Sequence, residues 1–242
     1  MRVVPSQQLL LPNTIGEVIA LTGPAGTFWG RLTSAEQAAF AAAATRSRFA
    51  AGEVIVGQGE QTKQVYVVLS GHIKVIAGAV AGHGVMLAVC GPGEVLGELS
   101  AIDGRPRSAT MTAIDAVDVL LLPAVRLEGL CDAHPKIAWS LLEVIARRLR
   151  ETDQQRAEYG GGSTMQRVVT LLLDLANRLG KLAADGVHIA SPFTQQELAE
   201  TASTSRESMA RVLRELREEG VITTGRGHFV IHRMERLREL VR

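Results

Sequence analysis

The pattern of hydrophobic and polar positions changes several times along the chain. Residues 1–30 are interrupted by glycine and proline and show no sustained period, so we expect an N-terminal extension there. Residues 33–45 are rich in alanine and open with Thr-Ser-Ala-Glu, which predicts a capped helix. Up to residue 133, short apolar runs with β-branched residues then alternate with glycines, at 53–56, 65–69, 73–76, 85–89 and 117–122. Such spacing, roughly ten residues, is typical of an antiparallel β-roll or sandwich.

Residues 134–159 have a different period, and they predict one long helix. Positions spaced alternately by four and three form one stripe, apolar in its first half and polar in its second: Ala138, Leu142, Ile145, Leu149, Thr152, Arg156 and Tyr159. This is the a/d repeat of a coiled coil, and a long helix that carries one usually pairs with its own copy. The alternative is a helix packed on its own domain. Residues 160–163, Gly-Gly-Gly-Ser, predict a hinge.

The last part of the chain predicts a winged helix-turn-helix. Helical stretches at about 164–180, 194–201 and 205–219 precede two apolar segments, which bracket the basic tip Gly225–Arg226–Gly227–His228. Thr194 and Ser205 are suitable N-caps for the second and third helices. Helix, helix, helix and a two-stranded ribbon is the layout of such a domain.

The start of the third helix carries the candidate chemistry of this domain. Arg206, Glu207 and Arg211 face outward there. Arginine matches the O6/N7 edge of guanine, and glutamate can accept from the N4 amino group of cytosine. The alternative is a solvated face with an Arg–Glu ion pair, worth less than about 1 kcal/mol. Including phosphate contacts, the predicted DNA-binding residues are Gln196, Ser205, Arg206, Glu207, Ser208, Arg211, Arg226 and His228.

The segment Ser205–Arg211 resembles the recognition helix of the bacterial cAMP receptor protein/FNR family. That helix reads Ser-Arg-Glu-x-x-x-Arg, and all these positions match here. The resemblance implies a palindrome with half-sites of the TGTGA type. Ser203 is a departure, because the family usually has glycine in this turn. A left-handed backbone at Ser203 would cost about 1 kcal/mol.

A second motif lies in the β-rich region. Gly97–Glu98–Leu99–Ser100, a spacer and Arg107–Ser108–Ala109 resemble the phosphate-binding cassette of cyclic-nucleotide-binding domains. Without that resemblance, such residues are more often turn chemistry. The resemblance implies that Glu98 binds the ribose 2′-hydroxyl and Arg107 the cyclic phosphate. It assigns the remaining oxygens to Ser108 and to the backbone of Gly97, Leu99 and Ser100.

The end of the long helix bears on the choice of base. In cAMP-responsive members a Thr-Ser or Thr-Asn pair meets the base there, and this chain has Thr152 and Asp153. Thr152 lies on the a/d stripe, where a polar residue that sets the register is the alternative. The Asp153 carboxylate only accepts hydrogen bonds, so it would suit the 6-amino group of adenine and repel the O6 of guanine. We therefore expect cAMP rather than cGMP, and the departure at Asp153 leaves weak or absent binding open.

Composition excludes several other classes of protein. The chain has 242 residues, 46% hydrophobic and 21% charged, with a net charge of +1, so no global field attracts nucleic acid or membrane. Cys90 and Cys131 form no CxxC pair, which gives no zinc or iron–sulfur motif. No catalytic triad or metal-ligand spacing is present, so we expect no enzyme and no metal. Neither a signal peptide nor a membrane span is expected, which indicates a cytoplasmic protein.

The predicted fold class is α+β. The expected segments are an N-terminal extension at 1–30, a cyclic-nucleotide-binding β-roll at 31–133, a dimerisation helix at 134–159, a hinge at 160–163 and a winged helix-turn-helix at 164–242. We expect a homodimeric transcription regulator controlled by cAMP, with double-stranded DNA and RNA polymerase as partners. Two alternatives remain open at this stage. One is a family regulator that binds DNA independently of cAMP or responds to another ligand, and the other is a nucleotide-binding interaction module without DNA binding.

Overall fold

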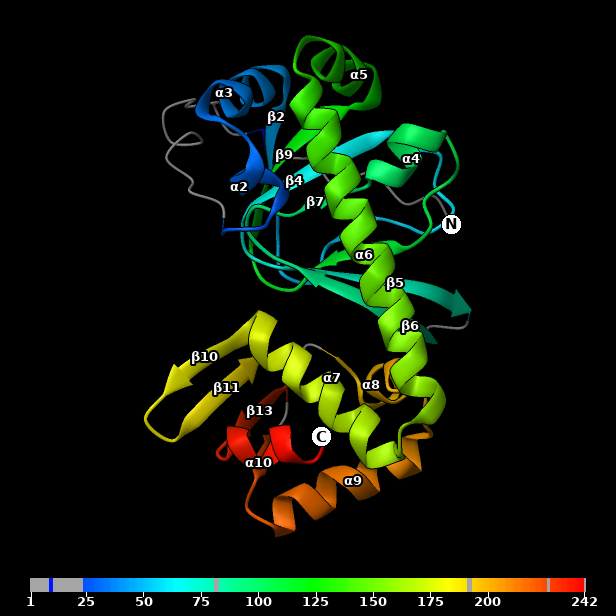
Figure 1. Ribbon diagram of the computed structural model, residues 1–242, viewed down its shortest axis with the longest axis vertical. Coiled ribbons are helices and arrows are strands. Elements are labelled where there is room, and N and C mark those ends of the chain that lie inside the picture. Colours follow the sequence, from blue (N-terminus) through cyan, green and yellow to red (C-terminus); the bar gives the residue numbers. More distant parts are fainter. Residues whose placement is uncertain (1–8, 11–23, 81–82, 191–192, 226, 242) are drawn as a thin grey trace. The chain divides into compact units, whose positions relative to one another are not determined.

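The computed structural model describes residues 9–10, 24–80, 83–190, 193–225 and 227–241, and the chain forms two compact units (Figure 1). Unit 1 comprises Met1–Val75 and Cys90–Arg150, and unit 2 comprises Ile76–Val89 and Glu151–Arg242. Most of the hairpin formed by β5 (Ile73–Val80) and β6 (His83–Cys90) therefore belongs to unit 2. The mixed helix and strand content confirms the α+β class.

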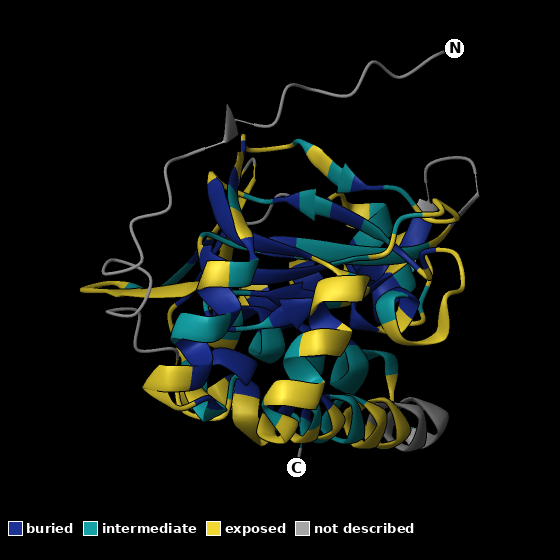
Figure 2. Cartoon of the chain, turned by 90° about the horizontal axis from the view of Figure 1, so that it is seen from above, coloured by how far each residue is buried: buried dark blue, intermediate teal, exposed yellow. Residues whose placement is uncertain are grey.

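The strands of the predicted β-roll form two sheets among the described residues, in the orders β1-β2-β9-β4-β7 and β3-β8-β5-β6. Neighbouring strands of the first sheet are antiparallel, and its strands β4 and β9 are buried along most of their length. Figure 2 shows the buried residues gathered on strands, with exposed residues mostly on helices and loops. The remaining bounds are β1 (Leu9–Leu10), β2 (Thr45–Phe49), β3 (Val54–Val56), β4 (Gln64–Ser70), β7 (Val95–Leu96), β8 (Thr110–Ala113) and β9 (Val117–Pro123). All five predicted runs fall on strands, whereas β1, β2, β7 and β8 were not predicted.

The core of unit 1 begins earlier in the chain than residue 31. Helix α2 (Phe28–Arg31) buries Phe28 and Trp29, whose rings meet the ring of Phe40 edge-on at centroid distances of 5.8 and 5.9 Å. Phe40 lies on α3 (Ser34–Ala43), whose predicted capping box between Thr33 and Glu36 is present. The predicted boundary at residues 30 and 31 therefore separates two core aromatic residues from the domain they stabilise.

The long predicted helix is α6 (Pro135–Gly161), preceded by α5 (Ala124–Ala133). In its first half, α6 buries Ile137, Leu141 and Val144 in the core of unit 1. α6 extends to Gly161, so the break before α7 (Thr164–Leu179) comprises Gly162 and Ser163 rather than all of 160–163. Ser163 caps α7 together with Gln166, which explains why the second helix starts at once.

Unit 2 contains the helix-turn-helix, α8 (Gln195–Thr201) and α9 (Arg206–Glu218), which follows α7. The predicted ribbon, β12 (Ile222–Gly225) and β13 (His228–Ile231), is part of a larger sheet, because β13 also pairs with β11 (Gly186–Ala190) and β11 with β10 (Gly180–Ala183). A short helix, α10 (Met234–Glu239), follows. Strands β10 and β11 were missed, although Asp185–Gly186, at the turn and the start of β11, is a hairpin signal.

Candidate functional site

The cassette of unit 1 is organised by a short helix, α4 (Glu98–Asp103), between two glycines. Gly97 and Gly104 have φ of 77° and 69°, a left-handed backbone that favours glycine. A Cβ atom on Gly97 would also lie 2.7 Å from the carbonyl oxygen of Gln64 and would collide with the guanidinium of Arg107. Glycine at position 97 therefore allows α4 to begin directly beside Arg107.

Arg107 is almost completely buried, with 2% of its surface exposed. Its Nε donates to the Thr62 hydroxyl at 2.8 Å, one terminal nitrogen to the carbonyl oxygen of Gly97 at 2.9 Å, and the other to that of Gln64 at 2.7 Å. The guanidinium also lies 5.6 Å from the centroid of the Tyr66 ring. Burial lowers the pKa of Arg107, and no salt bridge joins it to a carboxylate of the described residues.

Glu98 is also buried, with 3% exposed, and it forms an ion pair that the sequence did not predict. Arg148 on α6 donates to Glu98 Oε1 at 2.9 Å and to the carbonyl oxygen of Val95 at 2.7 Å. Burial alone would lower the pKa of Arg148, but the negative charges of Glu98 and its neighbours raise it. Glu98 Oε2 is buried without a hydrogen-bond partner among the described residues.

The other cassette residues differ in exposure. Ser100 is buried with 4% exposed, Leu99 is exposed at 46%, and Ser108 is exposed beside Arg107. The structure thus brings Gly97, Glu98, Ser100 and Arg107 together in unit 1. Thr152 and Asp153 are exposed on α6, and Thr152 lies one helical turn after Arg148.

In unit 2, α8 and α9 form the predicted helix-turn-helix. The predicted N-cap Thr194 accepts from the Glu197 amide in a capping box, and the predicted N-cap Ser205 accepts from the Ser208 amide at 3.1 Å. The apolar residues on the inner sides of the two helices are buried, namely Leu198, Ala199, Ala202, Met209, Val212, Leu213 and Leu216. Arg206, Glu207 and Arg211 are exposed on α9, as the amphipathic pattern predicts.

The turn between these helices contains the predicted strain. Ser203 has φ of 48°, and it is the non-glycine residue with positive φ among those described. Arg167 of α7 supports the turn, since it donates to the carbonyl oxygens of Ala202 at 3.0 Å and Ser203 at 3.3 Å. The sequence did not single out Arg167.

The residues predicted to contact DNA phosphates differ in how accessible the structure leaves them. The Gln196 side-chain amide donates to Oε1 of Glu200 on the same helix, at 2.7 Å. His228, in contrast, is exposed on the wing. The His228 ring lies over Gly225, where a Cβ atom would collide with it. Arg226 lies outside the described residues.

Two negative findings apply to the part of the chain that the structure describes. No group of three or more His, Cys, Asp or Glu residues is arranged to hold a metal ion there. Within the same residues, no helix has the length and hydropathy needed to cross a membrane.

A β-roll with a glycine-flanked cassette and a separate winged helix-turn-helix define a class of transcription regulators with a sensory and a DNA-binding domain. Residues 46–134 match the family model described as a cyclic nucleotide-binding domain, and residues 166–240 match the Crp-like helix-turn-helix domain.

Known proteins agree with this class. The chain is 33% identical to the cyclic AMP receptor protein of Thermus thermophilus over 81% of this chain and 87% of the relative. It is 31% identical to a CRP-like cAMP-activated global transcriptional regulator of Mycobacterium tuberculosis, over 78% and 84%. The structure of FixK2 from Bradyrhizobium japonicum superposes with a TM-score of 0.68 at 26% identity, over 81% of this chain and 96% of that one. The chain belongs to the CRP/FNR family of transcription regulators, whose members are not enzymes.

Proposed function

We propose that the chain is a homodimeric regulator whose affinity for a TGTGA-type palindrome is controlled by cAMP bound in unit 1. The observation that carries the proposal is the buried guanidinium of Arg107, which has three neutral acceptors and no carboxylate partner among the described residues. A buried cation is costly unless an anion compensates it. A cyclic phosphate supplies such an anion, and charge-assisted hydrogen bonds to it are stronger than those to neutral carbonyls.

The surroundings of Glu98 indicate that the ligand carries a sugar next to that phosphate. Arg148 neutralises the Glu98 carboxylate and holds it in place through Oε1, which leaves Oε2 to accept a further hydrogen bond. A buried acceptor without a partner costs about 1–3 kcal/mol, and a ribose hydroxyl would satisfy it. Arg107 thus calls for an anion and Glu98 for a neutral hydrogen-bond donor. A cyclic nucleotide combines both groups.

Asp153 supports adenine as the base. Its carboxylate is exposed in the second half of α6 and can only accept hydrogen bonds while ionised. The 6-amino group of adenine donates, whereas the O6 of guanine would meet the carboxylate with its own lone pairs. We therefore propose cAMP as the effector, with Thr152 as a second residue at the base.

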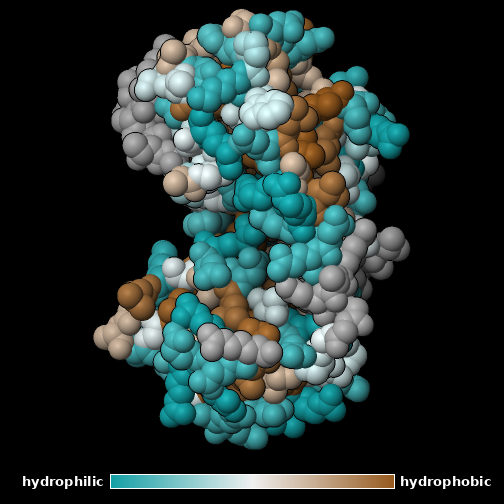
Figure 3. Space-filling view, in the orientation of Figure 1, coloured by the Kyte–Doolittle hydropathy of each residue, from teal (hydrophilic) through white to brown (hydrophobic). Residues whose placement is uncertain are grey.

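The surface of α6 supports the homodimer. While Ile137, Leu141 and Val144 are buried, the predicted a/d residues Leu142 and Leu149 are 57% and 61% exposed. Apolar side chains gather over the first part of α6 and next to α4 (Figure 3). An apolar stripe left open beside a buried one is the arrangement of a helix that pairs with a second copy.

In the proposed mechanism, cAMP acts through its different affinities for two arrangements of the dimer. In the favoured arrangement the two α9 helices lie about 34–36 Å apart, which is one turn of DNA. Arg206, Glu207 and Arg211 then read base edges, and a tenfold gain in DNA affinity needs about 1.4 kcal/mol of coupling.

Titration calorimetry with cAMP and cGMP tests the ligand. The wild type should bind cAMP more tightly than cGMP, and Arg107→Ala should lose binding of both. The control is Arg105→Ala, two residues away, because the Arg105 side chain is 84% exposed and lies outside the proposed contacts. Asp153→Asn, whose amide can also donate, should narrow the preference between the two nucleotides. Equal affinity for cAMP and cGMP, or no binding at micromolar concentrations, would contradict the proposed effector.

A further inference from the structure

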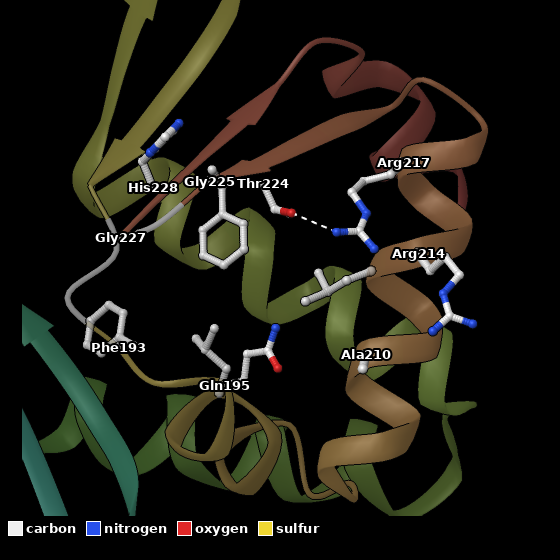
Figure 4. Close-up of a pocket in the computed structure, with 12 residues that line it drawn as sticks. Phe193, Gln195, Ala210, Arg214, Arg217, Thr224, Gly225, Gly227 and His228 are labelled. Atoms are coloured by element: carbon white, nitrogen blue, oxygen red, sulfur yellow. Dashed lines mark hydrogen bonds between the residues drawn. The ribbon is translucent and has the colours of Figure 1, made fainter.

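A pocket in unit 2 lies between the recognition helix α9 and the wing strands β12 and β13 (Figure 4). Its volume is about 230 Å³, below the roughly 300–1,000 Å³ of sites for drug-sized ligands. Phe193, Leu198 and Phe229 line it, and each is at most 8% exposed. The size and the mostly polar lining suit a small polar group that enters from the surface.

Arg217 and Gln195 supply N–H donors to this pocket, which Arg214 and His228 also line. Arg217 extends from α9 towards the wing and donates to the Thr224 hydroxyl at 3.0 Å (Figure 4). The Gln195 side chain extends from α8 into the same space (Figure 4). No salt bridge joins Arg217 to an acidic residue among those described. The pocket therefore presents a cation that a neutral hydroxyl holds in place.

The position of Arg217 along α9 indicates what it can reach. It follows Arg206 by eleven residues, or about 16.5 Å at 1.5 Å per residue. The major groove is about 12 Å wide, so a helix that reads bases with Arg206 brings Arg217 beyond the groove edge. DNA phosphates lie at that edge. The first helix of the motif also crosses the DNA backbone, and Gln195 is the first residue of α8.

We infer that this pocket binds one phosphodiester group of the DNA backbone in each half-site, with Arg217 as the charged contact and Gln195 as a neutral donor. The inference rests on the proposed DNA-binding function and adds to it a contact that reads no bases. Neutralising a phosphate releases counterions, so the contact must appear in the salt dependence of binding.

Fluorescence anisotropy of palindromic and scrambled duplexes across a salt series tests the inference. Arg217→Ala should make the plot of log affinity against log salt shallower by about 0.9 per protomer, or about 1.8 per dimer. Between 50 and 200 mM salt, the wild type would then lose about 12-fold more affinity than the variant. The change should be the same for both duplexes, and Arg217→Lys should restore the slope because it keeps the charge.

Two matched controls separate charge from structure. Thr224→Val removes the hydrogen bond to Arg217 but keeps the cation, so its slope should equal that of the wild type. Arg238→Ala removes an exposed cation of α10, outside the pocket, and should also leave the slope unchanged. A wild-type slope for Arg217→Ala, or an equal loss in Thr224→Val, would overturn the inference.

The remaining outcomes concern free phosphate and the proposed function. If inorganic phosphate at constant ionic strength displaced DNA from the wild type but not from Arg217→Ala, free phosphate would compete with DNA for the pocket, which would support the inference. If the wild type bound neither duplex, the proposed function itself would fail. Binding of DNA with an unchanged slope in Arg217→Ala would overturn only the pocket.

Discussion

Replacing Ser203 by glycine should stabilise unit 2. Ser203 has φ of 48°, and a left-handed backbone costs a residue with a Cβ atom about 1–2 kcal/mol. Glycine removes that strain. It also increases the conformational entropy of the unfolded chain, which lowers the gain in stability by about 0.4–1 kcal/mol. The carbonyl oxygen of Ser203, which accepts from Arg167, is a backbone atom and stays in place. The expected net gain is about 0.5–1 kcal/mol.

Scanning calorimetry on the full chain measures this gain. At about 4–8 °C per kcal/mol for a unit of roughly 100 residues, the transition of unit 2 should rise by roughly 2–8 °C. Ser203→Ala is the matched control, because it removes the same hydroxyl but keeps the strain, so it should give no gain. If glycine left the transition unchanged or lowered it, or if alanine stabilised as much as glycine, the assignment of strain to Ser203 would be refuted.

Three further substitutions test contacts inside each unit. Arg148→Ala should destabilise unit 1 by about 3 kcal/mol in urea unfolding, since it leaves the buried Glu98 carboxylate unpaired; no measurable loss would contradict the pairing. Thr201→Val should cost about 1–3 kcal/mol, because the buried amide of Met86 donates to the Thr201 hydroxyl at 3.1 Å, whereas Thr201→Ser should keep most of the stability. Burial opposes the charge of Asp118, but its two arginine partners hold its pKa below the ordinary 3.8. The charge of Asp118 therefore contributes its full stabilisation of the folded state above pH 3.8, and this contribution is lost as pH falls through the folded-state pKa. In unfolding experiments across this pH range, Asp118→Asn should lack this acid-dependent loss of stability.

The sequence predicted elements with a strong local signal. The caps at Thr33, Thr194 and Ser205 and the inward face of α9 follow from short-range rules, and the structure confirms them. The left-handed turn at Ser203 follows from one position in one motif. Such features depend on residues a few positions apart, which a single sequence displays directly.

Contacts between distant residues were not predictable in the same way. Arg148 lies 50 positions from Glu98, and nothing in its neighbourhood marks it as the partner of a buried carboxylate. Phe28 and Trp29 stand among glycines and prolines in an aperiodic segment, yet they pack against Phe40. Strand β10 is exposed along its whole length, so it has no apolar alternation to reveal it.

The stripe on α6 illustrates both cases. The a/d spacing correctly identified Leu142 and Leu149 as one face, and these residues are exposed in the single chain. The same spacing did not show that Ile137, Leu141 and Val144 form a second face that packs into unit 1. Because both faces are apolar, the helix can belong to its own unit and still present a surface to a second copy.

The most direct test of the account is the affinity of the purified protein for a TGTGA palindrome, measured by anisotropy without cAMP and with saturating cAMP. We predict at least a tenfold gain with cAMP for the wild type, which corresponds to about 1.4 kcal/mol of coupling. Arg107→Ala should show no gain, and Arg105→Ala should behave as the wild type. Equal affinity in the presence and absence of cAMP would contradict nucleotide control of DNA binding.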